Sequence, residues 1–295
     1  MKKTLFLSVL ALAIMALNGC KGKRVESRSN KVFVSIQPLK YFVQFIVDSS
    51  LQVEVLVPPG SSPELFEPTP QQMAELTQAK AYFSIGLLDF ERGMEQKLKD
   101  NAKFRYIDLS QGLDLIKGEC DHHHEHEGHQ GHTHAVDPHT WMSAINAKIM
   151  AKNIAQNLSV LFPEKETEFT NNLNLLESQI DSVDNSIRNI LTASGRKTFV
   201  IYHPALGYYA REYGLVQLSV EQEGKNPSAK GVMELVERCK VEGITTILSQ
   251  SQFDTRNAQT IANELAGTVV KVDPLQENWA ESMIFIANAI AGNVK

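Results

Sequence analysis

The sequence predicts an α/β protein made of two (β/α)4 lobes, each with a four-stranded parallel sheet, joined by a long rigid backbone helix. Two observations predict the lobes. Apolar, β-rich runs alternate with helical patterns in both halves of the chain, and its 295 residues exceed the size of one ordinary core. A third observation predicts the joining helix, because apolar residues recur at helical spacing along the segment between the halves.

The N-terminal segment is typical of an export signal. Residues 1–20 begin with Lys2 and Lys3, continue as an apolar run to Leu17 and end at Cys20. That run is shorter than the roughly 20 apolar residues of a membrane span. Its last four residues, LNGC, resemble a lipoprotein lipobox, which implies that Cys20 is acylated and holds the protein on the periplasmic side of a bacterial membrane. A plain secretory signal with a chance cysteine is the alternative, and residues 21–30 would form a polar tether.

Residues 31–162 form the expected N-terminal metal-binding lobe. Apolar runs at 32–36, 53–58, 82–88 and 104–109 predict its four strands, and a helical pattern follows each of the first three. The fourth run precedes a histidine-rich segment, and a helix from Ser143 to Leu161 closes the lobe.

One amphipathic helix is expected over residues 163–194. Pro163 opens this helix, and the helix ends near Gly195. At about 1.5 Å per residue it would span roughly 40 Å, which is enough to run along both lobes. The same stripe could be a coiled-coil dimer seam, but packing onto two compact lobes is favoured, and we expect a monomer. The stripe consists of Phe169, Leu173, Leu176, Ile180, Val183, Ile187 and Ile190.

Residues 195–295 repeat the alternation and form the expected C-terminal metal-binding lobe. Strands are predicted at 198–202, 216–220, 244–249 and 268–273. The net charge of -5 offers no basic stripe, which excludes nucleic acid as a partner. Apart from Cys20, the chain has Cys120 and Cys239, and the sequence gives no reason to pair them.

Four side chains that can bind a metal stand beside prolines, near the places where ligands collect in parallel sheets. They are Glu64, His139, His203 and Asp273. Proline restricts its own backbone and that of the preceding residue, so these side chains have little freedom. Two imidazoles and two carboxylates suit zinc and, less selectively, manganese or iron(II). Each residue taken alone could instead have an ordinary role as a helix cap, a core hydrogen-bonding group or a solvated carboxylate.

Four stretches carry a resemblance to a known family. They are PPGSSPELFEPTPQQM, DPHTWMS, VIYHPALGYYAREYGL and VKVDPLQENW. In this order around a long central helix, and behind a lipobox, they closely resemble the cluster 9 metal-binding proteins of zinc and manganese ABC transporters. The resemblance covers nearly all of the mature chain. It implies two (β/α)4 lobes, one buried divalent metal between them, and delivery of that metal to a membrane permease and its ATPase.

The chain departs from this family at two positions. The family usually has histidine where this chain has Glu64, and many members have glutamate where it has Gln250. Because a neutral amide is a poor ligand, we expect Glu64 to restore the carboxylate. Zinc members often carry a histidine-rich acidic loop at residues 121–134, which favours Zn2+ over Mn2+ as the transported substrate.

Seven of the nine histidines lie in that loop. They are interleaved with acidic residues and glycines, so the segment cannot form a hydrophobic element. Ordering it would cost entropy, and we therefore expect auxiliary, weaker metal sites that serve the fixed one. These histidines are His122, His123, His124, His126, His129, His132 and His134.

The sequence bears on two other functions. An enzyme is not expected, because catalytic zinc usually keeps three protein ligands and one open position, whereas the predicted set supplies four ligands. The chain also has no HExxH, GxSxG, P-loop or GxGxxG motif. A metal-binding adhesin or buffering lipoprotein without a permease would have the same fold, so the sequence leaves that alternative open.

Overall fold

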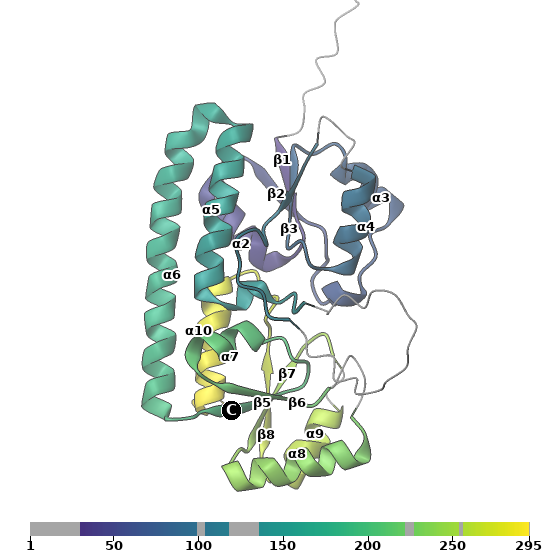
Figure 1. Cartoon of the computed structure of the whole chain (residues 1–295), viewed down its shortest axis with the longest axis vertical. Coiled ribbons are helices and arrows are strands. Elements are labelled where there is room, and N and C mark those ends of the chain that lie inside the picture. Colours follow the sequence, from purple (N-terminus) through teal and green to yellow (C-terminus); the bar gives the residue numbers. More distant parts are fainter. Residues whose placement is uncertain (1–29, 99–103, 118–135, 222–226, 254–255, 295) are drawn as a thin grey trace, which may run out of the picture.

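The computed structural model describes residues 30–98, 104–117, 136–221, 227–253 and 256–294 (Figure 1). It contains two four-stranded parallel sheets, with strand orders β2-β1-β3-β4 and β6-β5-β7-β8. Helices flank the sheets, and one long helix runs beside both of them (Figure 1). The predicted fold class is therefore confirmed.

The first sheet has short strands that lie within the predicted apolar runs or within one residue of them. Hydrogen bonding continues past the assigned end of β2: Leu56 and Val57 stay buried and donate to the carbonyls of Val34 and Ser35. The elements are β1 (Lys31–Val34), α2 (Gln37–Val47), β2 (Gln52–Val55), α3 (Pro70–Leu76), β3 (Ala81–Ser84), α4 (Asp89–Leu98) and β4 (Arg105–Asp108).

The second sheet is built in the same way. Strand β5 lies in its interior, with β6 on one side and β7 on the other. The elements are β5 (Thr198–Ile201), α7 (Gly207–Tyr213), β6 (Val216–Ser219), α8 (Ala229–Glu242), β7 (Thr246–Gln250), α9 (Arg256–Glu264), β8 (Thr268–Val272) and α10 (Trp279–Ala291).

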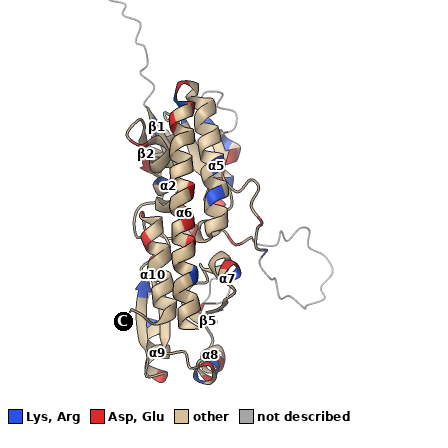
Figure 2. Cartoon of the chain, turned by 90° about the vertical axis from the view of Figure 1, so that its left-hand side faces the viewer, with Lys and Arg blue, Asp and Glu red and all other residues tan. Residues whose placement is uncertain are grey.

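Helix α6 (Glu166–Ser194) is the predicted backbone helix, 29 residues long. A 3-10 turn, Pro163–Lys165, precedes it, and Gly195 ends it in the left-handed conformation (φ 66°). It packs on α2 and α5 (Ala144–Leu161) of the first half and on α10 of the second, and charged residues are scattered along it (Figure 2). The apolar stripe thus packs within the chain, onto both halves.

The buried face of α6 drifts slightly from the predicted stripe. Near its C-terminal end Leu191 is buried, whereas the predicted Ile190 is only half-buried. The drift follows from helix geometry, because strict alternation of 3 and 4 has a period of 3.5 residues, while a straight helix has about 3.6 residues per turn. None of the helices in the described part of the chain combines the length and apolar character needed to cross a bilayer.

The two tryptophans of the chain link the halves. Trp141 Nε1 donates to the Pro274 carbonyl (2.8 Å), and Trp279 Nε1 donates to the Trp141 carbonyl (2.7 Å). Both side chains are 1% exposed, so these bonds lie in the core. They fix the segment after His139 against the segment after Asp273.

Candidate metal centre

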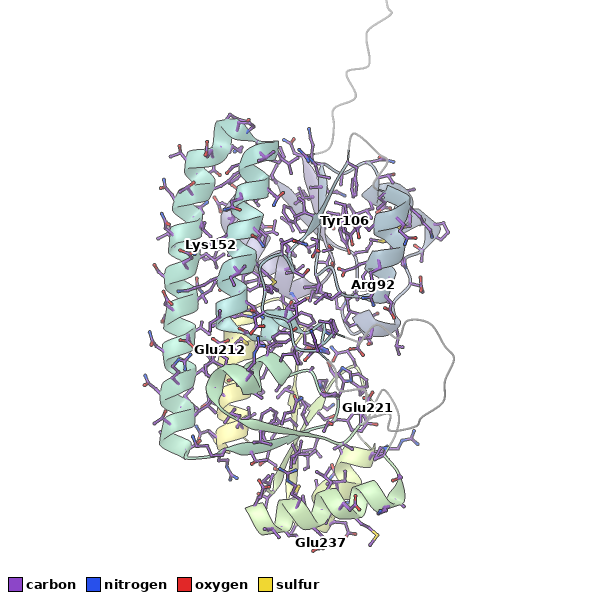
Figure 3. The ribbon with its side chains drawn as sticks, in the orientation of Figure 1. Arg92, Tyr106, Lys152, Glu212, Glu221 and Glu237 are labelled. Carbon is purple, nitrogen blue, oxygen red and sulfur yellow. The ribbon has the colours of Figure 1, made fainter. Side chains whose placement is uncertain are left out.

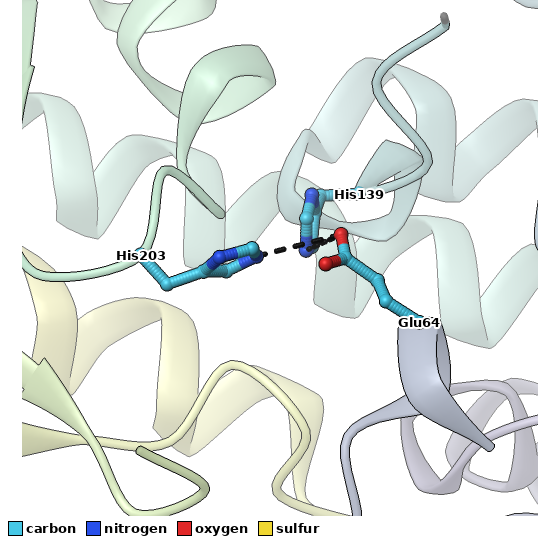
Figure 4. Close-up of side chains that lie close together, drawn as sticks. All are labelled: Glu64, His139 and His203. Carbon is cyan, nitrogen blue, oxygen red and sulfur yellow. Dashed lines mark ion pairs between the residues drawn. The ribbon is translucent and has the colours of Figure 1, made fainter. Parts of the chain in front are cut away.

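Three side chains from three separate loops converge between the lobes (Figure 4). Glu64 lies in a 3-10 turn (Pro63–Leu65) after β2, and His139 immediately precedes another (Thr140–Met142). His203 follows β5, at the carboxyl end of the second sheet. Their ligand atoms all lie within 4.8 Å of one another.

The spacing of these atoms fits a tetrahedral ion. Glu64 Oε1 lies 3.4 Å from His203 Nε2 and 3.7 Å from His139 Nε2. Zinc bonds of about 2.0–2.2 Å at tetrahedral angles place ligand atoms about 3.3–3.5 Å apart. The two oxygen–nitrogen distances therefore lie within a few tenths of an ångström of the spacing in a zinc coordination shell.

His139 is oriented by the residue two positions before it. Asp137 Oδ1 accepts hydrogen bonds from His139 Nδ1 (2.8 Å) and from the His139 backbone N–H (2.9 Å). Because a carboxylate can only accept, the ring proton belongs on Nδ1, and Nε2 keeps its lone pair for the centre. The Asp137 carbonyl in turn accepts from Tyr208 of the other lobe (2.8 Å).

His203 is held on several sides. Its Nδ1 lies 3.2 Å from Glu221 Oε2, and the Phe253 ring stacks on the imidazole at 4.7 Å and 16°. Its backbone N–H and carbonyl both hydrogen-bond to the side chain of Gln250. Both histidines are 7% exposed, whereas the Glu64 side chain is 35% exposed.

The electrostatics of the centre favour positive charge. Burial alone would raise the pKa of Glu64, but the hydrogen bond to His203 and the charges of the two imidazoles lower it overall. Burial alone would lower the pKa of His203, but its hydrogen bond and charge interaction with Glu64, together with Glu221, raise it overall. A proton is therefore stabilised between Glu64 Oε1 and His203 Nε2. A cation bound at this place would replace that proton.

Asp273 lies beside this cluster but outside it. Its Oδ1 accepts from the Leu275 N–H of its own loop (3.0 Å) and from Gln252 Nε2 of the loop after β7 (3.1 Å), so two loops of the second half hold it. It lines a neighbouring pocket, which shares Gln252 and Leu275 with the cleft that holds the three other residues. The structure brings together three of the four predicted ligands, and ligation by Asp273 stays a prediction.

Several predicted features lie outside the described residues: Cys20, Cys120 and the seven histidines of residues 121–134. The described ends of that segment meet, because Lys117 and Val136 form an antiparallel bridge. Val136, on one side of this bridge, is three residues before His139. Cys239, in contrast, is a buried free cysteine.

Sequence reasoning missed Glu221 and considered Gln250 only as a poor metal ligand, not as a partner of His203. Glu221 follows β6 and Gln250 ends β7, both at the carboxyl end of the second sheet. The same strand-end argument that selected His203 could have flagged them, but neither is next to a proline.

Comparisons with known proteins show what the whole chain is similar to. The model of the family "Zinc-uptake complex component A periplasmic" matches residues 32–292. A crystal structure of ZnuA superposes with a TM-score of 0.81 at 33% identity, covering 90% of this chain and 98% of that one. A ZnuA deletion mutant with zinc bound gives 0.79 at 33% identity, covering 89% and 97%. A zinc-binding lipoprotein, AdcA of Streptococcus pneumoniae, is 26% identical over 93% of this chain, which spans 56% of AdcA.

Proposed function

Because the chain belongs to the periplasmic zinc-uptake component A family, we propose that it captures Zn2+ outside the cytoplasm and delivers it to an ABC transporter. The family consists of solute-binding proteins for metals and not of enzymes. The predicted resemblance and the expectation that the chain is not an enzyme are therefore confirmed.

The meeting of Glu64, His139 and His203 carries the proposal. The carboxylate oxygen lies close to tetrahedral spacing from each imidazole nitrogen, and each imidazole has a carboxylate near its far nitrogen. This arrangement is typical of zinc ligands. Imidazoles suit zinc better than they suit harder ions such as Mn2+, and Asp273 or water would supply the fourth position.

Delivery requires a membrane partner. We propose that a permease and its ATPase receive the ion, that Cys20 carries the lipid that keeps the protein at the membrane, and that the histidine-rich segment collects zinc near the centre. The lipoprotein AdcA supports the anchor, and the closeness of Lys117 and Val136 to His139 supports the role of the segment.

Metal titration tests the centre. The purified, untagged protein should bind one equivalent of zinc tightly against a competing chelator, and manganese more weakly. His203→Ala and His139→Ala should each weaken tight zinc binding by more than about tenfold, since each removes one ligand. His122→Ala, a histidine change in the collecting segment, is the matched control and should leave the tight constant unchanged. Equal constants for all four proteins would place the tight site elsewhere.

A further inference from the structure

We propose that Glu221 and Gln250 are positioning residues that together present His203 to the metal. Glu221 favours the imidazole tautomer with its proton on Nδ1, and Gln250 holds the backbone of His203 in place. The inference rests on the proposed function, because it takes His203 to be a ligand. Neither residue would touch the ion.

The N-terminal lobe shows the two tasks performed by one residue. Asp137 Oδ1 accepts from both the backbone N–H and the ring Nδ1 of His139. A neutral imidazole has two tautomers, and only the one with its proton on Nδ1 offers Nε2 as a ligand. Asp137 therefore fixes both the tautomer and the peptide.

In the C-terminal lobe the same tasks are divided. Ring Nδ1 of His203 lies within hydrogen-bond distance of Glu221 Oε2 (3.2 Å), and the His203 backbone N–H donates to Gln250 Oε1 (3.2 Å). The sheet order explains the division. His203 follows the interior strand β5, so the ends of β6 and β7 lie on either side of it, one supplying Glu221 and the other Gln250.

Gln250 makes a second bond that a carboxylate could not make. Its Nε2 donates to the His203 carbonyl (2.7 Å), so one amide accepts from and donates to the same residue. Gln250 is 2% exposed, so water cannot easily replace either bond. The glutamine that looked like the loss of a ligand is therefore suited to hold this peptide, because an ionised glutamate would have no hydrogen to give the carbonyl.

Glu221 is itself fixed. It is 7% exposed, and its N–H donates to the Tyr202 carbonyl (2.9 Å), which ties it to the chain directly before His203 (Figure 3 labels Glu221). Phe253 covers one face of the imidazole. With one edge on Glu221 and one face on Phe253, the ring directs Nε2 toward Glu64.

The test uses two nearly isosteric changes in the full chain. Glu221→Gln removes the carboxylate charge that favours a proton on Nδ1, and Gln250→Met removes both bonds to the His203 backbone. Loss of a group that orients a metal ligand typically costs about 10–100-fold in affinity, and we expect each variant to lose zinc affinity in this range in a chelator competition. Gln217→Glu is the control. Gln217 lies on β6 and accepts from Leu206 through an oxygen that glutamate keeps, so zinc affinity should not fall.

A second measurement separates positioning from loss of structure. In metal-free protein that carries Glu64→Ala, so that no carboxylate of the cluster faces Nε2, nitrogen NMR of the histidine rings at about pH 8.5 should find the His203 proton on Nδ1. Glu221→Gln should move part of the population to the Nε2 tautomer, while circular dichroism shows the parent fold.

The outcomes are distinct. If His203→Ala binds zinc as the parent does, the proposed centre itself is wrong. If His203→Ala loses zinc while Glu221→Gln and Gln250→Met keep the parent constant and tautomer, the centre stands and the positioning roles are refuted. Loss of affinity with the tautomer unchanged in Glu221→Gln would refute the role given to Glu221.

Discussion

Removal of Glu64 is the most direct test of the centre, because Glu64 is its only carboxylate among the three clustered residues and stands where the family usually has histidine. A carboxylate oxygen about 2.1 Å from a divalent ion attracts it by about 4 kcal/mol even with the screening of bulk water. The Glu64 side chain is 35% exposed, so this solvent-screened value is the suitable one. Water entering the vacated position would recover part of it. We expect Glu64→Ala to lose at least about 2 kcal/mol, or about thirtyfold in zinc affinity.

The assay is a zinc titration against a chelator of known affinity, with parent, Glu64→Ala and Glu64→His in a background lacking residues 121–134. Glu64→His should keep zinc tight and shift preference away from manganese, since imidazole suits zinc and carboxylate suits the harder ion. Glu67→Ala is the control, because it removes an exposed carboxylate from the same loop outside the cluster. Equal zinc constants for the parent and Glu64→Ala would remove Glu64 from the site.

Three further results are expected. Deletion of residues 121–134 should abolish weak zinc binding and leave the tight constant within about tenfold, as chelator titration would show; loss of tight binding would make the segment the primary site. Zinc affinity should fall as pH drops through the raised pKa of His203, because protons then compete for its nitrogen; a titration series that stays flat from about pH 7.5 to 5 would count against the imidazoles as ligands. Trp279→Phe should lower the free energy of unfolding by about 1–3 kcal/mol in urea, because the buried Trp141 carbonyl loses its donor; an unchanged midpoint would show that this bond contributes little.

The periodic parts of the fold could be predicted from the sequence because burial leaves a local pattern. The eight strands are short apolar runs between helical patterns, and the stripe of α6 extends over 29 residues. Strand ends could not be placed to the residue, since Val57 is buried and hydrogen-bonded beyond the end of β2. A pattern of burial does not show where a ladder stops.

The parts of the centre that stand beside prolines could be predicted from the sequence. The parts that depend on which side chains meet in the fold could not. Glu64, His139 and His203 stand beside prolines after predicted strands, and the fold brings them together. Asp273 follows the same rule, yet its carboxylate lies outside the cluster, where it accepts hydrogen bonds from Leu275 of its own loop and from Gln252 of the loop after β7. Sequence spacing fixes where such a residue lies along the chain, but not which donors its oxygens meet.

The distance between the imidazoles depends on how the lobes pack, because His139 and His203 belong to different lobes. A flexible connection would let that distance vary, and zinc binding would then include the cost of ordering two domains. Here α6 packs on helices of both lobes, and the two tryptophan N–H groups cross the boundary directly behind His139. Tyr208 adds a third link, from α7 to the Asp137 carbonyl. The residue that orients His139 is thus itself held by the lobe that carries His203, so the same contacts that join the lobes also set the spacing of the ligands.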